Sequence, residues 1–395
     1  MKQRVPFYYN EFGCITSECK DNCCIGGWEI DIDDETYERY NSMTCELKSR
    51  ILDSITQNED EEYCFKLCDG KCPMLDDNGL CEIHKNLGED YLGVVCKQFP
   101  RYSEYYGTIK ESGIGLACEE AARIILSENR PFSMETAACD EQYEPSSEYD
   151  SSFALQIFAA REAVFKILAE ESLSIHEKLI VILDMGSKIQ QCINTDEYDN
   201  IKSVVNDYLK EGIAHTLDET RNLSDSGQFE DISLQQGIRQ ILYPYEEMEV
   251  LNPEWEVILK DIIDSLFEQM SDEEYNILNE EFGTYMVSRA YEYRQLLEYL
   301  VFRYFAKSIY DYDFLGKCQM LVTNFFVIRQ MDIIRWLDNH REYSFKDRMN
   351  VVHIFSRQVE YSEDNIENLY EDFIFDDIFK TDSLIAILWI DSENI

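Results

Sequence analysis

The apolar positions in the second half of the chain recur with the period of amphipathic helices. Ile157, Val164 and Leu168 fall on one face of a helix, with Phe158 and Phe165 beside them. Residues three, four and seven positions apart lie on the same side of a helix, so this spacing predicts a buried helical stripe. The pattern continues in two later segments, Leu296 to Ile309 and Leu321 to Leu337.

A capping box marks the start of another helix. In Ser174-Ile175-His176-Glu177, the serine and the glutamate stand three positions apart. At that spacing each side chain can accept a hydrogen bond from the other residue's free backbone amide. Apolar residues follow at helical spacing, namely Leu179, Ile182, Leu183 and Ile189. We therefore predict that a helix begins after Ser174.

Two later segments differ from this pattern. Residues 217–233 (LDETRNLSDSGQFEDIS) are polar and hold turn formers, so we interpret them as a loop. After Arg357, acidic and apolar residues alternate (ENLYEDFIFDDIFK). This pattern predicts a last amphipathic helix and a chain end that packs against the rest of the fold. The chain has only 7 prolines and 16 glycines in 395 residues, too few for a many-stranded sheet protein. The predicted fold is mainly α, and we find no repeat of fixed period.

Composition and charge exclude several classes of protein. Hydrophobic residues make up 45% of the chain, which excludes global disorder. The net charge is −44 and is spread along the whole chain, so it leaves no basic face for nucleic acid. This acidity has two interpretations, which are solubility and the steering of a Lys-rich protein partner.

The termini and the apolar runs predict no membrane association. No apolar stretch follows Lys2 and Arg4, so we expect no secretory signal. The longest apolar run with few charges, Cys318 to Ile328, is too short to span a bilayer. An intracellular protein keeps its thiols reduced, so the fourteen cysteines are interpreted as metal ligands plus buried thiols.

The distribution of cysteines divides the chain. Eleven lie in residues 1–125, and only Cys139, Cys192 and Cys318 follow. We predict a cysteine-rich metal-binding module with little regular sheet over 1–138 and an α-helical region over 153–395. The polar segment from Cys139 to Ser152 (CDEQYEPSSEYDSS) is the predicted linker. Eleven cysteines in so short a region indicate a metal centre, whereas the three later cysteines are interpreted as buried packing residues.

The spacing of the cysteines favours an iron–sulfur cluster over zinc. Zinc sites usually show C-x2-C pairs, and this chain has none. The series Cys64-x3-Cys68-x3-Cys72 comes close to the radical S-adenosylmethionine signature C-x3-C-x2-C, but its second gap is one residue too long. Cys23 and Cys24 are adjacent, so their side chains diverge and cannot both be equivalent ligands of one small site. Either two metal centres lie close together, or one of the two thiols is not a ligand. Such a thiol would pack in the core or donate a hydrogen bond to a ligand.

Two other sequence features give weaker signals. His84 follows Cys81 by three residues and is either a further ligand or an ordinary histidine. The pair Gly113-Ile114-Gly115 lacks the third glycine of a dinucleotide-binding loop.

Three stretches in the first 125 residues resemble one family, the flagellin lysine-N-methylases, and the wider C-x-x-C-x-x-C-C type of zinc- or iron-chelating proteins. The stretches are FGCITSECKDNCCIGGWEIDID, KCPMLDDNGLCEIHKNLGEDYLGVVCKQFPR and GLACEEAAR. A looser similarity covers YLVFRYFAKSIY and VVHIFSRQVEYSEDNIENL. The resemblance implies a [4Fe–4S] cluster, methyl transfer from S-adenosylmethionine to flagellin lysines, and a cytoplasmic location.

The resemblance also implies a set of ligands. The family's cysteines fall on Cys14, Cys19, Cys23, Cys24, Cys72, Cys81, Cys96 and Cys118. Cys45, Cys64 and Cys68 lie outside the family's pattern and are expected to be structural thiols. Four ligands suffice for one [4Fe–4S] cluster, so the other four form a second site, support the first, or pack.

Methyl transfer to lysine sets its own chemical demands. A lysine amine is nucleophilic only when neutral, and its reference pKa is about 10.4. We therefore expect an apolar, aromatic pocket with one acid or tyrosine. Tyr8, Tyr9, Tyr102, Tyr105 and Tyr106 could line such a pocket or serve only as packing residues. Arg101, in the QFPR segment, could hold a carboxylate of the methyl donor in bidentate fashion or form an ion pair in the fold.

The sequence thus predicts an iron–sulfur protein lysine N-methyltransferase that uses S-adenosylmethionine and acts on flagellin. The first alternative is a non-enzymatic protein that chelates zinc or iron for storage, sensing or delivery. The second is a helical interaction protein in which the metal only stabilises the fold.

Overall fold

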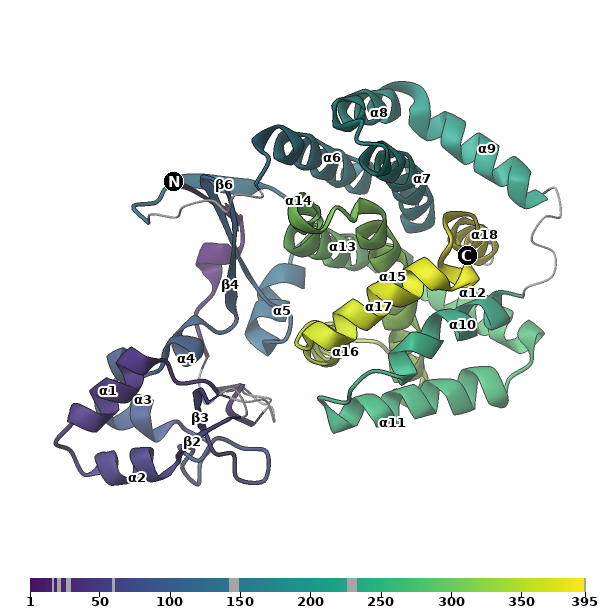
Figure 1. Cartoon of the computed structure of the whole chain (residues 1–395). Coiled ribbons are helices and arrows are strands. Elements are labelled where there is room, and N and C mark those ends of the chain that lie inside the picture. Colours follow the sequence, from purple (N-terminus) through teal and green to yellow (C-terminus); the bar gives the residue numbers. More distant parts are fainter. Residues whose placement is uncertain are drawn as a thin grey trace.

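The computed structural model describes residues 1–15, 18–19, 23–25, 30–58, 61–141, 149–225 and 233–393. Most of them are helical, which confirms the prediction of a mainly α fold. Figure 1 shows a small group of helices at the lower left, a narrow sheet above it and a large helical region on the right.

A four-stranded sheet joins the two ends of the N-terminal region, and the sequence analysis did not predict it. The strand order is β4 (Arg101–Tyr106), β5 (Ile109–Ile114), β1 (Lys2–Pro6) and β6 (Met134–Ala138). β1 runs parallel to β5 and antiparallel to β6, and Gln3 pairs with Lys110 and with Ala137. The first residues of the chain are therefore fixed beside residues more than a hundred positions away.

A second, smaller unit lies between β1 and β4 in the sequence. Its elements are α1 (Asp34–Ser42), α2 (Leu47–Asp53), β2 (Ile55–Gln57), β3 (Tyr63–Phe65), α3 (Glu82–Leu87) and α4 (Val94–Gln98). They enclose a separate hydrophobic core, to which the described residues contribute eight buried side chains, among them Ile30, Tyr40, Phe65 and Met74. Asp33 caps α1 by accepting from the backbone N–H of Thr36 at 2.9 Å.

The large core contains the C-terminal helices together with the sheet and α5 (Glu119–Leu126). The longest helix, α15 (Phe314–Asp338), is buried over most of its length and contacts α7, α11, α13 and α16. The remaining α-helices are α6 (Ser151–Ala169), α7 (Ile175–Asn194), α8 (Ile201–Asp207), α9 (Ile213–Asp225), α10 (Leu234–Glu246), α11 (Pro253–Ile262), α12 (Asp272–Met286), α13 (Ala290–Tyr304), α14 (Ser308–Asp311), α16 (Phe345–Val359), α17 (Glu363–Phe375) and α18 (Thr381–Glu393).

A buried ion pair fixes the sheet to these helices. Arg161 of α6 donates from Nη1 and Nη2 to the two carboxylate oxygens of Glu111 in β5, at 2.7 and 2.6 Å. Both side chains are almost fully buried, at 2% and 3% exposure. The large hydrophobic core likewise contains residues from both sides of position 138, so its contacts cross the predicted division there. Whether 1–138 and 153–395 are separate domains stays a prediction.

The local helix signals agree with the structure in most places. The capping box at Ser174 and Glu177 is confirmed, and α7 begins at Ile175. The helix predicted over Leu321 to Leu337 lies within α15. The segment from Leu296 to Ile309 is helical too, although a short 3-10 turn, Phe305–Lys307, divides it into α13 and α14.

Two predictions near the loops need correction. The loop predicted over 217–233 is wrong for residues 217–225, which belong to α9, and residues 226–232 lie outside the described part. Contacts with α18 hold this polar helix, because Nε1 of Trp389 donates to the hydroxyl of Thr220 at 3.1 Å. The segment after Arg357 does form an amphipathic helix, α17, but α18 follows it.

Two other sequence expectations concern the linker and the membrane. Of the linker predicted over 139–152, residues 142–148 lie outside the described part, and α6 begins at Ser151. None of the helices that the structure describes is long and apolar enough to cross a membrane.

Candidate functional site

Four of the eight predicted ligand cysteines meet in the small core. Cys72 is buried in it, and Cys24, Cys81 and Cys96 pack against it. The backbone N–H of Cys72 donates to the carbonyl of Cys24 at 2.8 Å, which joins two cysteine patches directly. Cys81 immediately precedes α3 and Cys96 lies in α4. We call these residues the four-cysteine group.

The other four predicted ligands lie toward α5. Cys118 immediately precedes α5 and interacts electrostatically with Cys14 and Cys23. The thiol of Cys19 lies 3.7 Å from Oε2 of Glu119, the next residue after Cys118. Cys23 also interacts electrostatically with every member of the four-cysteine group. Cys23 therefore connects the two sets of four.

Burial and neighbouring thiols raise the pKa of most of these cysteines, which favours their protonated form. Burial, together with neighbouring thiols, raises the pKa of Cys72 to about 11 and that of Cys96 to about 12. Burial likewise raises the pKa of Cys118 to about 11. A hydrogen bond from Cys24 instead lowers the pKa of Cys23, whereas the pKa of Cys24 rises. Whether both members of this adjacent pair could ligate one centre stays a prediction.

The three cysteines of residues 1–125 that lie outside the predicted set have different surroundings. Cys64 is buried in β3 and Cys45 is half-buried before α2. Cys68 is exposed in a turn, although it is close enough to raise the pKa of Cys72. Within the described ranges, no three Cys, His, Asp or Glu side chains form a group that could hold a metal ion. Ligation by the eight cysteines therefore stays a prediction, and so does the role of His84.

A cluster of tyrosines around one ion pair lies where α13 and α16 meet the sheet. Nε of Arg303 is 2.8 Å from Oε2 of Glu360, which directly follows α16. The hydroxyls of Tyr299 and Tyr304 donate to the same oxygen at 2.8 and 3.0 Å. The guanidinium of Arg303 stacks on the ring of Tyr102 in β4, 4.3 Å from its centroid. With Tyr8, which interacts electrostatically with Tyr102 and Arg303, these residues form the Arg303–Glu360 cluster.

Tyr361 connects this cluster to the cysteines. It follows Glu360 in sequence, and its hydroxyl would stand 3.0 Å from a Cβ placed on Gly115. Tyr361 interacts electrostatically with Arg303, Cys118 and Cys23. Burial is the main reason why the pKa of Tyr361 is raised to about 12. The cysteines, the end of β5 and the end of α16 thus meet around this tyrosine.

A second carboxyl group on α13 has an unusual acidity. Glu298 is almost fully buried, and Nη1 of Arg294 lies 2.7 Å from its Oε1. Burial raises the pKa of Glu298 to about 7, although Arg294 opposes the rise. Because Glu298 also acts electrostatically on Tyr8, it lies beside the Arg303–Glu360 cluster. A carboxyl group with such a pKa can accept or release a proton near neutral pH.

Comparisons with known proteins place the chain in a family. The family model described as "FliB lysine N-methylase C-terminal domain" matches residues 161–387, more than half of the chain. The chain belongs to the FliB lysine N-methylase family. The matched range includes Arg303 of α13 and Glu360, which directly follows α16.

Curated relatives match a shorter stretch. The chain is 33% identical over 129 residues to the "Flagellar biosynthetic protein FliU" of Salmonella muenchen, which covers 31% of this chain and 76% of that one. It is equally similar over 129 residues to the "Lysine-N-methylase" of Salmonella typhimurium, with 32% of that protein covered. The chain thus spans about a third of the length of that lysine methylase. No solved structure matches the chain.

The donor set fits the chemistry of the metal centre that the family resemblance implies. Thiolates are the ligands of iron–sulfur clusters, and a bound cation reverses the energetic preference for protonated thiols. The four-cysteine group supplies four thiols from three chain segments around one small core. That number and that chemistry suit a [4Fe–4S] cluster, and four thiolates would also suit zinc.

The structure separates the other predicted site residues into two kinds. Of the five tyrosines, Tyr8 and Tyr102 belong to the Arg303–Glu360 cluster, whereas Tyr106 packs against Phe158 and Tyr310. Tyr105 lies near Lys110, and Tyr9 lies near Arg101. Arg101 donates to the carbonyl of Phe12 at 3.2 Å and stacks on its ring. Binding of the methyl donor by Arg101 stays a prediction.

Sequence reasoning missed Tyr299, Arg303, Tyr304, Glu298 and Glu360. Four of them lie in the two segments that showed the looser family similarity, 299–310 and 351–369. That similarity was the available signal, and it gave no roles to individual residues.

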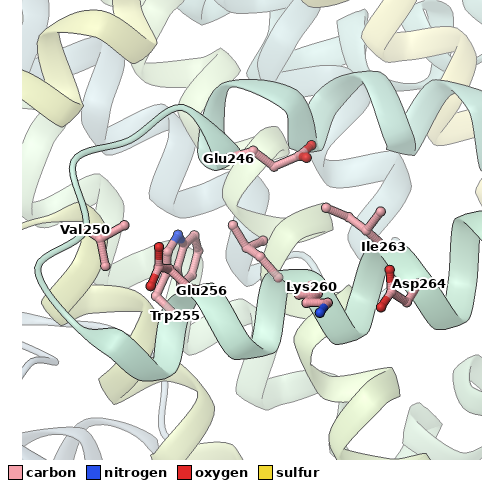
Figure 2. A pocket seen from close by; sticks show the side chains of 8 residues that line it. Glu246, Val250, Trp255, Glu256, Lys260, Ile263 and Asp264 are labelled. Carbon is pink, nitrogen blue, oxygen red and sulfur yellow. The ribbon is translucent and has the colours of Figure 1, made fainter.

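A surface hollow elsewhere carries no comparable chemistry. It has a volume of about 230 Å³ and is lined by residues of α10, α11, the turn between them and the π-helical segment Ile263–Glu268, including Trp255, Lys260 and Asp264 (Figure 2). Glu246, at its edge, already forms an ion pair with Arg239.

Proposed function

We propose that the protein is a lysine N-methyltransferase that transfers methyl groups from S-adenosylmethionine to lysines of flagellin. Membership of the lysine N-methylase family carries this proposal. A relative named as a flagellar biosynthetic protein supports flagellin as the substrate. The net charge of −44 suits approach to a lysine-bearing surface. Methylation would then take place in the cytoplasm, before flagellin is exported.

We further propose that the four-cysteine group holds a [4Fe–4S] cluster. Its members share one core, whereas Cys14, Cys19 and Cys118 lie toward α5. A bound cluster would supply either a redox centre or an ordering element for the adjacent active site. Cys23, which neighbours both sets, would then be a positioning residue beside the cluster.

The chain supplies groups for the proton that lysine must lose. Three donors hold Oε2 of Glu360 in a fixed place, so this carboxylate is a binding group. Glu298 is the better proton acceptor, because its pKa of about 7 matches the working pH of a general base. The aromatic rings of Tyr8, Tyr102 and Tyr299 would exclude water and favour the neutral amine.

The decisive experiment combines a metal assay with a transfer assay. Protein purified anaerobically should contain iron and sulfide and show a visible absorption spectrum. Incubation with S-adenosylmethionine and unmethylated flagellin should add methyl groups to lysines, seen by mass spectrometry. A colourless protein with stoichiometric zinc would contradict the iron–sulfur centre. Absence of lysine methylation would favour the alternative function, a non-enzymatic metal-chelating protein.

Variants of single cysteines sharpen this test. Cys72→Ser should lose both iron and methyl transfer, because Cys72 belongs to the four-cysteine group. Cys45→Ser is the matched control, since Cys45 lies in the same small unit but outside the predicted ligands. Equal iron content in the two variants would contradict the assignment of ligands.

A further inference from the structure

Four buried polar atoms of the Arg303–Glu360 cluster have no hydrogen-bond partner of normal geometry. Within the part of the chain that the structure describes, they are Nη1 of Arg303, Oε1 of Glu360, and the hydroxyls of Tyr8 and Tyr102. Buried polar groups in folded proteins are nearly always paired, so unpaired ones need an explanation. Here one atom belongs to a cation, one to an anion and two to hydroxyls.

The partnered atoms hold the unpaired ones in place. Nε of Arg303 and Oε2 of Glu360 lie 2.8 Å apart, so the ion pair uses only one edge of each group. Tyr299 and Tyr304 also bind Oε2 of Glu360, which leaves Oε1 free. The guanidinium is further fixed by stacking on Tyr102. A rigid cationic donor and a rigid anionic acceptor therefore stand on neighbouring groups.

Two glycines make room for this arrangement. A Cβ on Gly113 would collide with the hydroxyl of Tyr102. A Cβ on Gly115 would lie 3.0 Å from the hydroxyl of Tyr361 and 3.7 Å from Nη1 of Arg303. The absence of side chains at Gly113 and Gly115 thus leaves space for the tyrosines at the end of β5. In the sequence, these two glycines gave only a weak signal of a nucleotide-binding loop.

One edge of the cluster is open to the solvent. Tyr361 keeps 36% of its surface exposed, and the side chain of Arg303 keeps 14%. Glu360 has a fully buried side chain behind them. A small ligand that displaced the ring of Tyr361 would therefore meet Arg303 first and Glu360 second.

We propose that the Arg303–Glu360 cluster binds the α-amino-acid end of S-adenosylmethionine. This inference rests on the proposed function, which supplies the methyl donor. The donor's carboxylate pairs with Nη1 of Arg303 and a tyrosine hydroxyl, and its α-ammonium pairs with Oε1 of Glu360. A simple anion would leave the free carboxylate oxygen unpaired, and a lysine ammonium would leave the free guanidinium N–H unpaired. Among charged ligands, a zwitterion satisfies both.

The position of the cluster agrees with this assignment. Tyr361 interacts electrostatically with both Arg303 and the thiols of Cys118 and Cys23. A donor held by its amino-acid end at Arg303 would thus lie beside the cysteines. Nη2 of Arg101 donates to the carbonyl of Phe12 and its guanidinium stacks on the ring of that residue, whereas Nη1 of Arg303 is buried without a partner and is therefore available for the carboxylate.

A ligand series on the wild-type protein gives the first test. Affinities would be measured by calorimetry for S-adenosylmethionine, for its decarboxylated form, and for 5′-methylthioadenosine, which lacks the whole amino-acid end. Because charged hydrogen bonds are removed, we expect each truncated ligand to bind roughly 10- to 100-fold more weakly. Equal affinities for the three ligands, or binding of none, would overturn the inference.

Two conservative variants give the second test. Arg303→Lys and Glu360→Gln should weaken binding of S-adenosylmethionine by about tenfold or more and leave 5′-methylthioadenosine within about twofold. Arg341→Lys is the matched control, since Arg341 is 55% exposed and its salt bridge joins it to Glu281, which is not a member of the cluster. Circular dichroism would establish that each variant is folded.

The outcomes separate this inference from the proposed function. Variants that weaken all ligands equally, or none, would overturn the role of the cluster even if the protein methylates flagellin. A protein that binds S-adenosylmethionine through Arg303 but methylates no lysine would support the cluster and overturn the proposed function.

Discussion

The two hydrophobic cores of this protein differ in what holds them together. The core of residues 30–96 has eight buried members, one of which is Cys72, whereas the large core runs through the sheet and most C-terminal helices. Small cores supply little stabilising energy, and small units often depend on a metal or a disulfide. The large core has no such need. Its thiols, such as the fully buried Cys318, pack against ordinary neighbours, here Gly186.

The contrast indicates where cysteines have a chemical purpose and where they only fill space. In the small core, four cysteines from separate segments lie in or against one core, and burial raises the pKa of Cys72, Cys81 and Cys96, which favours the protonated thiols when no metal is bound. In the large core, ion pairs and tyrosine hydroxyls make the buried polar contacts. The two regions meet at Cys23, Cys118 and Tyr361, where the proposed active site lies.

Removal of the metal should have the largest effect, and only on the small unit. Structural metal sites contribute on the order of 10 kcal/mol of folding free energy, which exceeds what a core of this size supplies. After chelation of the anaerobically purified protein, α1–α3 should lose protection from hydrogen exchange, while α7 and α15 keep theirs. Mass spectrometry of peptic fragments measures both.

Continued protection of α1–α3 from hydrogen exchange after chelation would contradict this difference between the two cores. In that case the small core would be stable by itself, and the cysteines would be catalytic or storage ligands without a structural role. Cys45→Ser should leave the protection of the small unit unchanged, because Cys45 is not a predicted ligand.

A charge removed from the large core should have the next largest effect. Arg348 is fully buried, with Nη1 2.6 Å from Oδ2 of Asp332 and Nε 3.0 Å from Oε2 of Glu292. Arg348→Leu leaves two buried carboxylates without this cation, which typically costs 3–5 kcal/mol, so we expect a loss of about that size. Thermal or denaturant unfolding would measure it.

The matched control and the metal content complete this prediction. Arg341→Leu removes an exposed arginine and should change stability by less than about 1 kcal/mol. Folded Arg348→Leu protein should bind as much iron as the wild type, because the network lies in the other core. Loss of iron in this variant would show that the cores depend on each other.

Glu298 tests whether the large core also takes part in the chemistry. A carboxyl group with a pKa of about 7 accepts a proton only when ionised, so methyl transfer should rise as the pH passes through about 7. Glu298→Gln should remove this limb and lower the transfer rate by roughly 100-fold, equivalent to about 2.7 kcal/mol. An unchanged pH–rate profile would assign the limb to another group. Glu281→Gln, at an exposed position, is the control.

The sequence allowed the local features of the fold to be predicted and left the distant pairings hidden. The helices around Ser174 and within Leu321 to Leu337 depend on spacings of a few residues, which a sequence displays directly. The sheet depends on β1, whose five residues pair with strands more than a hundred positions away. Strands so short show no usable alternation.

The same distinction applies to the candidate site. Cysteines are rare residues, so their clustering was visible, but which of them share a core was not. Tyr8 and Tyr102 were among five tyrosines that could line a pocket or serve only as packing residues. Arg303 and Glu360 look in sequence like ordinary polar positions of surface helices. Only the packing of α13 and the end of α16 against the sheet brings them together and buries them.

The smallest effect is expected from the helix signal that was easiest to predict. In the capping box, the backbone N–H of Glu177 donates to the hydroxyl of Ser174 at 3.2 Å, and the N–H of Ser174 donates to the Glu177 carboxylate at 2.8 Å. Ser174→Ala should reduce the free energy of unfolding by about 1 kcal/mol, whereas Ser172→Ala, two residues before the cap, should have a smaller effect. Because α7 packs against α15 and α18 in the large core, tertiary contacts should keep the helix intact. A loss of several kcal/mol would show that the large core depends on local caps as strongly as the small core is expected to depend on its metal.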